Sequence, residues 1–346
     1  MSTPIEWDHA TEKVDPPSAQ SPTEPCPACG EAPFRSLFSA HDVLCEITNR
    51  EFQLVECQSC RLIRLHPQPL PEQLRDYYPD EYWLEPDRPL HGSQEEGAAA
   101  TIENIYRHIA SLDLIRFVER SLEESGEPGL VLDVGPRGGL RLSLLAGRLS
   151  NPQAGLDFTV DAAQQTALKR HIPIVCGTLS RAPFTPGSCA LLILFHVLEH
   201  LYDPVPYLNA ARELLAPDGR LIVQVYNASS WQFLLFGDRW SGLNVPRHLI
   251  HFRRKDAELL LGECGFEILR EKHFSWRDSP AACATSLAPS LDPSLRRLRR
   301  LVETPAQRAW KTAAYALLCG LCVPFTLLEA SCRAGAAIVF EARKKS

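Results

Sequence analysis

The stretch Leu130-Val131-Leu132-Asp133-Val134-Gly135-Pro136-Arg137-Gly138-Gly139 decides the fold of this chain. Its aliphatic first half predicts a buried strand, and the glycines that follow predict a sharp turn into a helix. In α/β folds such a strand-turn-helix unit brings a nucleotide-like ligand close to bare backbone at the helix N-terminus. Arg137 stands where such a loop usually has another glycine.

Three nucleotide-binding loop patterns can be compared with this stretch. A dinucleotide fingerprint requires two further glycines, at positions where the chain has arginine and leucine. A phosphate-binding loop requires Gly-Lys-Ser/Thr, which does not follow here. The S-adenosylmethionine (SAM) loop, Asp/Glu-x-Gly-x-Gly-x-Gly, is matched by Asp133, Gly135 and Gly139, with Gly138 beside the last. A strand-to-helix turn without a ligand is the alternative.

The composition limits the class of protein. The chain has 346 residues, 45% of them hydrophobic, and a net charge of -6. These values predict a folded protein with a sizeable core and argue against nucleic acid as a partner. Residues 1–25, rich in Pro, Ser, Thr and Glu, are predicted to be a disordered tail. Twelve cysteines without an apolar N-terminal signal segment predict reduced thiols and a cytoplasmic location.

Two C-x-x-C pairs form the sharpest local pattern in the chain. Each pair can bind one edge of a tetrahedral Zn²⁺, and Cys26, Cys29, Cys57 and Cys60 together supply four thiolates. Strand-like sequence between the pairs predicts a zinc ribbon stabilised by this structural metal, with a Pro- and Tyr-rich extension that completes a unit over 26–84. A redox dithiol is the alternative use of one such pair.

Strand and helix signals alternate after a linker at about 85–100. Residues 101–125 have aliphatic side chains at helical spacing, which predicts an amphipathic helix. Strands are predicted at 130–134, 153–157, 172–176, 189–195, 220–226, 266–272 and 337–342. The alternation predicts an α/β, Rossmann-like sheet of seven mostly parallel strands with helices on both faces. Ligands of such sheets bind beyond the carboxyl ends of the strands.

Several segments together resemble class I SAM-dependent methyltransferases in order and spacing. They are Gly155-Leu156-Asp157, Ala182-Pro183-Phe184, Leu194 to Pro204, Arg212 to Leu221, Trp240, and Val245 to Phe252. The last two resemble a branch of that superfamily with an N-terminal zinc ribbon, which Cys26 to Trp83 matches here. The resemblance implies a methyltransferase domain over 101–346 and a small-molecule acceptor, such as a sugar or natural-product intermediate.

The resemblance also implies a SAM site at the strand ends. Asp157 is expected to bind the ribose hydroxyls, Phe158 to lie against the adenine, and His196 to face the sulfonium. The loop of Asp133, Gly135, Gly138 and Gly139 is expected to approach the methionine part. A helix N-cap or turn carboxylate is the alternative role of Asp157.

Some residues depart from the pattern of the relatives. Thr178, expected at the cofactor site, replaces an acid near the adenine amino group, and Cys189-Ala190 replaces a Phe-Asp pair. Arg137 either points outward or meets the carboxylate of SAM. These departures leave a second hypothesis open, a methyltransferase-like binding or scaffold protein that has lost catalysis.

Glu199, His200, His248 and His251 are the candidate catalytic residues. Methyl transfer from a sulfonium is an in-line displacement, so the protein mainly aligns the reactants, and a base at the acceptor helps further. In related quinone-pathway O-methyltransferases an acidic/His cluster has a metal-associated role, which His196, Glu199 and His200 resemble. The structural alternatives are that Glu199 and His200 cap and pack the next helix, and that His248 and His251 are hydrogen-bonded loop residues.

His196-Val197-Leu198-Glu199-His200 also matches H-x-x-E-H, the motif of inverzincin zinc peptidases. That mechanism requires the motif well inside a helix. Here it directly follows an apolar strand, which disfavours the peptidase.

The segment at about 276–335 is predicted to be a helical insertion before the last strand. Basic residues around 295–301 precede an uncharged apolar run, Ala313 to Leu328, which at 16 residues is short for a membrane span. A helical pair that packs as a lid or homodimer contact is one hypothesis. Peripheral membrane contact through 295–330 is the other.

Overall fold

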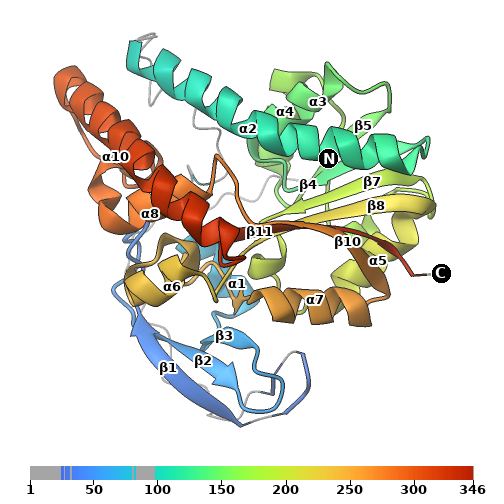
Figure 1. Ribbon diagram of the computed structural model, residues 1–346, viewed down its shortest axis with the longest axis horizontal. Coiled ribbons are helices and arrows are strands. Elements are labelled where there is room, and N and C mark those ends of the chain that lie inside the picture. The colour runs from blue at the N-terminus through green and yellow to red at the C-terminus, as the bar shows by residue number, and fades with distance from the viewer. Residues whose placement is uncertain (1–24, 27, 32, 80–81, 83–97, 346) are drawn as a thin grey trace, which may run out of the picture.

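The computed structural model describes residues 25–26, 28–31, 33–79, 82 and 98–345, with the side chains of 98–109 and Arg137 outside that description. The predicted disordered tail and nearly all of the predicted 85–100 linker lie outside the described residues. Figure 1 shows the chain as a large sheet flanked by helices, with a smaller sheet at one end.

The large sheet has seven strands in the order β10-β11-β8-β7-β4-β5-β6. They are β4 (Leu130–Val134), β5 (Gln153–Asp157), β6 (Ile174–Cys176), β7 (Cys189–Phe195), β8 (Leu215–Tyr226), β10 (Phe266–Lys272) and β11 (Ala337–Lys344). Strands β4 to β8 pair in parallel, and β11 is antiparallel to both of its neighbours. The predicted Rossmann-like class is therefore confirmed.

The central strands are buried on both faces because helices cover both. All seven residues of β7 are buried, as expected for a central parallel strand. Leu191 and Ile193 pack in one cluster with the long helix α2 (Ala98–Ser125), whereas Leu192 and Leu194 face the cluster that contains α5 (Val205–Leu214). This alternation follows from the two-residue period of a strand.

The small sheet joins distant parts of the chain. Its order is β1-β2-β3-β9, with β1 (Phe34–Ala40), β2 (Phe52–Cys57), β3 (Ile63–His66) and β9 (Ile250–His251), all antiparallel. We call residues 25–66 the cysteine ribbon. Strand β9 lies in the chain between the large-sheet strands β8 and β10. Its backbone hydrogen bonds to β3 therefore attach the small sheet to the large-sheet part of the chain. The sequence pattern did not predict this strand.

Three helices lie between β10 and β11, within the predicted insertion. They are α8 (Ser279–Leu287), α9 (Pro293–Leu298) and α10 (Pro305–Ser331). Helix α10 begins at a capping box of Thr304 and Gln307 and continues through Pro324, so it is 27 residues long. The 16-residue apolar run is therefore only part of the helix, whose first turns also contain Arg308, Trp310 and Lys311.

The remaining elements are short and connect these layers. They are α1 (Pro71–Leu74), α3 (Leu140–Ala146), α4 (Val160–Arg170), α6 (Trp231–Phe236), α7 (Arg254–Glu263) and the 3₁₀ turns η1 (Arg75–Tyr77), η3 (Arg137–Gly139), η4 (Leu179–Arg181), η5 (Leu198–His200), η6 (Gly237–Arg239), η7 (Ser241–Leu243) and η8 (Pro289–Leu291).

Candidate active site and metal-binding cluster

The loop after β4 has the backbone conformation that its glycines predict. Gly135, Gly138 and Gly139 have φ values of 65°, 76° and 71°, which side chains with a Cβ rarely adopt. A Cβ on Gly139 would also lie 2.7 Å from Cγ2 of Thr166 in α4. The loop is thus held against α4, and bare backbone lines the carboxyl end of β4.

Asp133 and Arg141 form a buried pair beneath this loop. Asp133 is fully buried, and its Oδ2 lies 3.6 Å from Nε of Arg141, which also lies over the ring of Phe195. Neither carboxylate oxygen of Asp133 has a hydrogen-bond partner among the described residues, and burial raises the pKa of this carboxyl. Unpartnered buried polar atoms point to a missing partner. A carboxyl group beside a guanidinium suits the ammonium and carboxylate groups of an amino acid, such as the methionine part of SAM.

Asp157 and Phe158 lie where the sequence predicts, at the carboxyl end of β5. Asp157 is 2% exposed, and its Oδ1 accepts a hydrogen bond from the backbone N–H of Thr159 at 3.3 Å. It therefore has a turn role, and Thr159, not Asp157, caps helix α4. The ring of Phe158 is 39% exposed, which leaves a face open for a flat ligand. Thr178 is exposed at the end of β6, with its Oγ1 3.5 Å from Oγ of Ser180.

His196 and Glu199 form a dyad at the carboxyl end of β7. Nδ1 of His196 lies 3.1 Å from Oε1 of Glu199, which also accepts the backbone N–H of Tyr226 at 2.9 Å. Glu199 is 1% exposed, and its pKa is lowered because the hydrogen bond from His196 and nearby imidazoles outweigh burial. An ionised Glu199 places the imidazole hydrogen on Nδ1 and the lone pair on Nε2.

Two observations make His196 a candidate functional residue. Its Nε2 is buried and has no hydrogen-bond partner among the described residues. Its backbone has a φ of 53°, a conformation that costs energy in a non-glycine residue and is concentrated at functional sites. From the sequence, His196 was expected to face the sulfonium of the cofactor and to resemble part of a metal-associated cluster with Glu199 and His200. The structure shows that it also has the orientation of a general base, because a buried carboxylate holds its other nitrogen.

The other three predicted residues lie beside this dyad. Nδ1 of His200 is 3.0 Å from the backbone oxygen of Arg247 and 3.0 Å from the hydroxyl of Tyr78. The rings of His200 and His248 are 4.7 Å apart, and those of His248 and His251 are 6.4 Å apart. The structure therefore brings all four predicted catalytic residues into one cluster.

The three histidines differ in burial. His248 and His251 are 2% and 3% exposed, whereas His200 is partly exposed. Burial and neighbouring imidazoles lower the pKa of His248, and burial lowers that of His251 to about 4. Nδ1 of His248 donates to the backbone oxygen of Gly242 at 3.0 Å, as a hydrogen-bonded loop histidine would. His248 and His251 are thus buried and neutral, and Nε2 of His251, like that of His196, has no hydrogen-bond partner among the described residues. His200 is the most exposed of the three.

Residues from the N-terminal part complete the cluster, which the sequence did not predict. Tyr78 comes from the Pro- and Tyr-rich extension, and Arg247 forms a buried ion pair with Asp42 of the cysteine ribbon. Arg247 also donates to the backbone oxygen of Tyr77 at 2.8 Å. The Tyr77-Tyr78 pair was a visible signal, whereas nothing in the sequence around Asp42 marks it.

The H-x-x-E-H motif does not form a peptidase site. It begins directly after β7 and ends in the 3₁₀ turn η5 instead of lying inside an α-helix, and His196 and His200 contact different partners. Among the described residues, the group of metal-ligating side chains close enough to share an ion consists of the four ribbon cysteines. The predicted metal-associated cluster at His196, Glu199 and His200 is therefore not assembled.

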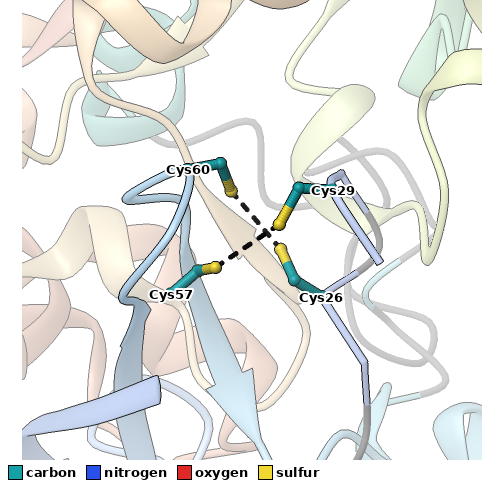
Figure 2. Close-up of side chains that lie close together, drawn as sticks. All are labelled: Cys26, Cys29, Cys57 and Cys60. Atoms are coloured by element: carbon teal, nitrogen blue, oxygen red, sulfur yellow. Dashed lines mark hydrogen bonds between the residues drawn. The ribbon is translucent and has the colours of Figure 1, made fainter. Parts of the chain in front are cut away.

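The four cysteines converge as the two C-x-x-C pairs predict (Figure 2). Sγ of Cys26 lies 3.5 Å from that of Cys60, and Sγ of Cys29 lies 3.5 Å from that of Cys57. Their ligand atoms all lie within 4.8 Å of one another. Four thiolates about 2.3 Å from a tetrahedral zinc lie about 3.8 Å apart, so the cluster fits this metal.

The part of the chain that matches known proteins contains most of the large sheet. Residues 106–271 match the family described as "Methyltransferase domain". The ubiquinone biosynthesis O-methyltransferase of Glaesserella parasuis is 27% identical over 144 residues, which cover 38% of this chain and 61% of the relative. That of Cereibacter sphaeroides is 31% identical over 133 residues, which cover 34% of this chain and 50% of the relative. The chain thus spans between half and about three-fifths of the length of these curated relatives.

Solved structures with a similar fold are more distant in sequence. The geranyl diphosphate C-methyltransferase of Streptomyces coelicolor, in complex with Mg²⁺, geranyl diphosphate and S-adenosyl-L-homocysteine, has a TM-score of 0.47 and 14% identity, covering 80% of this chain and 100% of that one. A SAM-dependent methyltransferase from Aquifex aeolicus has a TM-score of 0.37 and 15% identity, covering 45% and 83%. From the family match and the strand order together, residues 106–271 are identified as part of a domain of the class I SAM-dependent methyltransferase superfamily.

Proposed function

We propose that this protein transfers the methyl group of SAM to a hydroxyl of a small molecule, a sugar or natural-product intermediate. The single observation that carries the proposal is the His196–Glu199 dyad, whose unpartnered Nε2 lies at the carboxyl end of β7. The family match supports the cofactor, and the curated O-methyltransferase relatives support an oxygen acceptor. The positive-φ glycine loop, the Asp133–Arg141 pair and exposed Phe158 supply the groups that such a cofactor requires.

Bound SAM supplies an electrophilic methyl on a sulfonium. Asp157 and Phe158 would hold the nucleoside end, while Asp133 and Arg141 would offer opposite charges to the amino-acid end. Nε2 of His196 takes the proton of the acceptor hydroxyl as its oxygen attacks, and ionised Glu199 stabilises the imidazolium that results. Because Glu199 is held by both His196 and the backbone of Tyr226, the imidazole is oriented before the acceptor binds.

His200 and Tyr78 line the acceptor side of this proposed site. The backbone oxygen of Arg247 can only accept, so Nδ1 of His200 carries a hydrogen and its lone pair lies on Nε2. A methyl-acceptor molecule bound here would meet an imidazole nitrogen that accepts hydrogen bonds and a phenol hydroxyl. This pair of groups suits a molecule with several hydroxyls. Tyr78 makes the N-terminal extension part of the acceptor site.

Calorimetry with SAM and S-adenosylhomocysteine tests the proposal. Wild type is expected to bind both, and Asp157→Ala is expected to weaken binding at least tenfold because the ribose loses its carboxylate partner. Binding of neither ligand at millimolar concentration would favour the scaffold alternative. Methyl transfer from labelled SAM to a panel of sugars and phenols then identifies the acceptor class.

We also propose a structural Zn²⁺ in the four-cysteine cluster and a cytoplasmic location. The convergence of the four sulfur atoms supports the metal. A closed four-thiolate site leaves no open position for a substrate, so the metal stabilises the ribbon and takes no part in the reaction.

A further inference from the structure

Helix α10 leaves a long apolar face uncovered. Trp310, Leu317, Leu321 and Leu328 fall on one side of the helix at helical spacing and are 56%, 66%, 68% and 56% exposed. By length and composition α10 could cross a membrane, yet only 22% of its apolar window is buried inside the protein, unlike a core helix. Figure 1 shows α10 running along the outside of the molecule beside α8.

The opposite face of α10 is tied to the protein by polar contacts. The hydroxyl of Tyr315 lies 2.8 Å from Oγ1 of Thr285 in α8. Both carboxylate oxygens of Glu329 accept hydrogen bonds from Gln232, each at 2.9 Å, and Glu329 is fully buried. A helix that crossed a bilayer would lose these contacts and expose Glu329 to lipid, which is unfavourable for a carboxyl group. The polar attachments therefore favour a helix that stays on the protein surface.

The apolar face continues onto a second element. Trp231 of α6 packs on Phe325 of α10, with ring centroids 6.4 Å apart. Leu234 and Leu235 of the same short helix are 72% and 67% exposed. Exposed apolar side chains from two adjacent helices make a broad surface, which fits a flat lipid surface better than the narrow seam of a helix pair.

The basic residues that precede the apolar face along the chain favour binding to anionic lipid. Residues 293–311 contain six Lys and Arg and one Glu, whereas residues 312–328 contain no charged residue and the chain as a whole has a net charge of -6. Arg296 and Lys311 both pair with Glu303, and Arg299 pairs with Glu46, so part of this charge is neutralised within the protein. Arg308 is exposed two residues before Trp310. A cation and a tryptophan at the end of an apolar helix are the groups that anchor it among lipid headgroups.

We propose that the exposed face of α10, together with Leu234 and Leu235, binds the surface of an anionic lipid bilayer, with the helix in the membrane plane. This surface lies on helices α6 and α10, uses none of the residues of the histidine cluster, and does not depend on methyl transfer. A lipid-linked acceptor would be presented to the protein at such a surface.

Co-sedimentation of the full chain with vesicles tests the proposal. Wild type is expected to pellet with phosphatidylcholine/phosphatidylglycerol vesicles, to pellet less with phosphatidylcholine alone, and to be released by high salt. Leu317→Gln/Leu321→Gln is expected to lower the partition coefficient at least tenfold. The matched control is Leu168→Gln/Leu259→Gln, which changes exposed leucines of α4 and α7 and should bind as wild type does. Circular dichroism confirms that each variant is folded.

Four outcomes would overturn the proposal. The first is folded wild type that remains in the supernatant with both vesicle types, and the second is an α10 double variant that pellets as wild type does. The third is a dimer, seen by light scattering without vesicle binding and dissociated by the α10 variant, which would make the face a contact between two copies. Resistance of the bound protein to alkaline carbonate extraction would contradict the in-plane orientation.

Discussion

The carboxylate of Asp42 and the guanidinium of Arg247 form an ion pair in which both side chains are fully buried. Asp42 belongs to the cysteine ribbon, and Arg247 immediately precedes His248 of the histidine cluster. The backbone oxygen of the same arginine binds Nδ1 of His200. A single residue thus connects the ribbon, the extension and the proposed acceptor site.

Asp42→Asn is expected to lower the free energy of unfolding by about 3 to 5 kcal/mol, because it leaves a buried guanidinium without its counter-ion. Urea unfolding measures the change. Asp42→Asn/Arg247→Met is expected to be more stable than Asp42→Asn alone, since the second change removes the unpaired charge. Glu267→Gln, which breaks the exposed pair with Arg343, is the control and should change stability by less than about 1 kcal/mol. If Asp42→Asn and Glu267→Gln lowered the free energy of unfolding by the same amount, burial would not be the reason for the effect at Asp42.

His196→Asn and Glu199→Gln are expected to lower kcat by about 10²- to 10⁴-fold, because each removes proton transfer from the acceptor. The Kd for SAM should stay within about threefold of wild type by calorimetry, which separates this role from cofactor binding. His171→Asn, on the exposed end of α4 and in a left-handed conformation that Asn tolerates, is the control. Full activity of both variants would exclude the dyad as the base.

Stability is expected to fall as the pH drops from about 6.5 to about 4. The pKa of His251 is about 4 in the folded protein and 6.5 when unperturbed, so the unfolded chain binds its proton first as the pH falls. The free energy of unfolding is therefore higher by about 3 kcal/mol above pH 6.5 than it is at about pH 4, where this contribution has been lost. His248 acts in the same direction.

Urea unfolding of wild type and His251→Asn at several pH values measures this effect. The variant should show a shallower loss of stability across the same range. A pH dependence identical in the two proteins would mean that His251 does not contribute it.

Gly139→Ala is expected to destabilise the protein by about 1 to 3 kcal/mol and to weaken SAM binding. The added Cβ meets Thr166 at 2.7 Å, and a φ of 71° is strained for alanine. Gly147→Ala, at a φ of -78° with open space around it, is the matched control and should leave stability nearly unchanged. Thermal unfolding and calorimetry report the two effects separately.

Cys57→Ser is expected to reduce bound zinc from one ion per chain to near zero and to lower the unfolding temperature. Elemental analysis of the purified full chain measures the metal. Cys176→Ser changes an exposed cysteine outside the cluster and should leave the zinc content unchanged. If wild type lacks zinc after purification in zinc-supplemented medium, the structural-metal proposal is wrong.

All seven strands of the large sheet were predicted from the sequence, because each carries apolar residues between turn signals or predicted helices. The four-cysteine group was also predicted, since the ligand types and the spacing within each pair set the chemistry. The predicted roles of Asp157, Phe158 and Thr178 remain predictions, although all three lie at strand ends. These features depend on local patterns, which a sequence shows directly.

Other features come from contacts between segments far apart in the chain. Strand β9 has two residues, too few to show a period, and it becomes a strand only because β3 offers an unpaired edge. Tyr78 reaches His200, and Asp42 reaches Arg247, by the docking of the ribbon on the large sheet.

The sequence by itself determined a class I methyltransferase sheet, a four-cysteine ribbon and a set of candidate histidines. Only the tertiary structure decided that Glu199 orients His196, that His248 and His251 are buried and neutral, and that α10 leaves an apolar face exposed. The physical reason is that residue type and period determine which groups are buried locally. Hydrogen-bond partners, tautomers and uncovered surfaces depend on which distant segments meet.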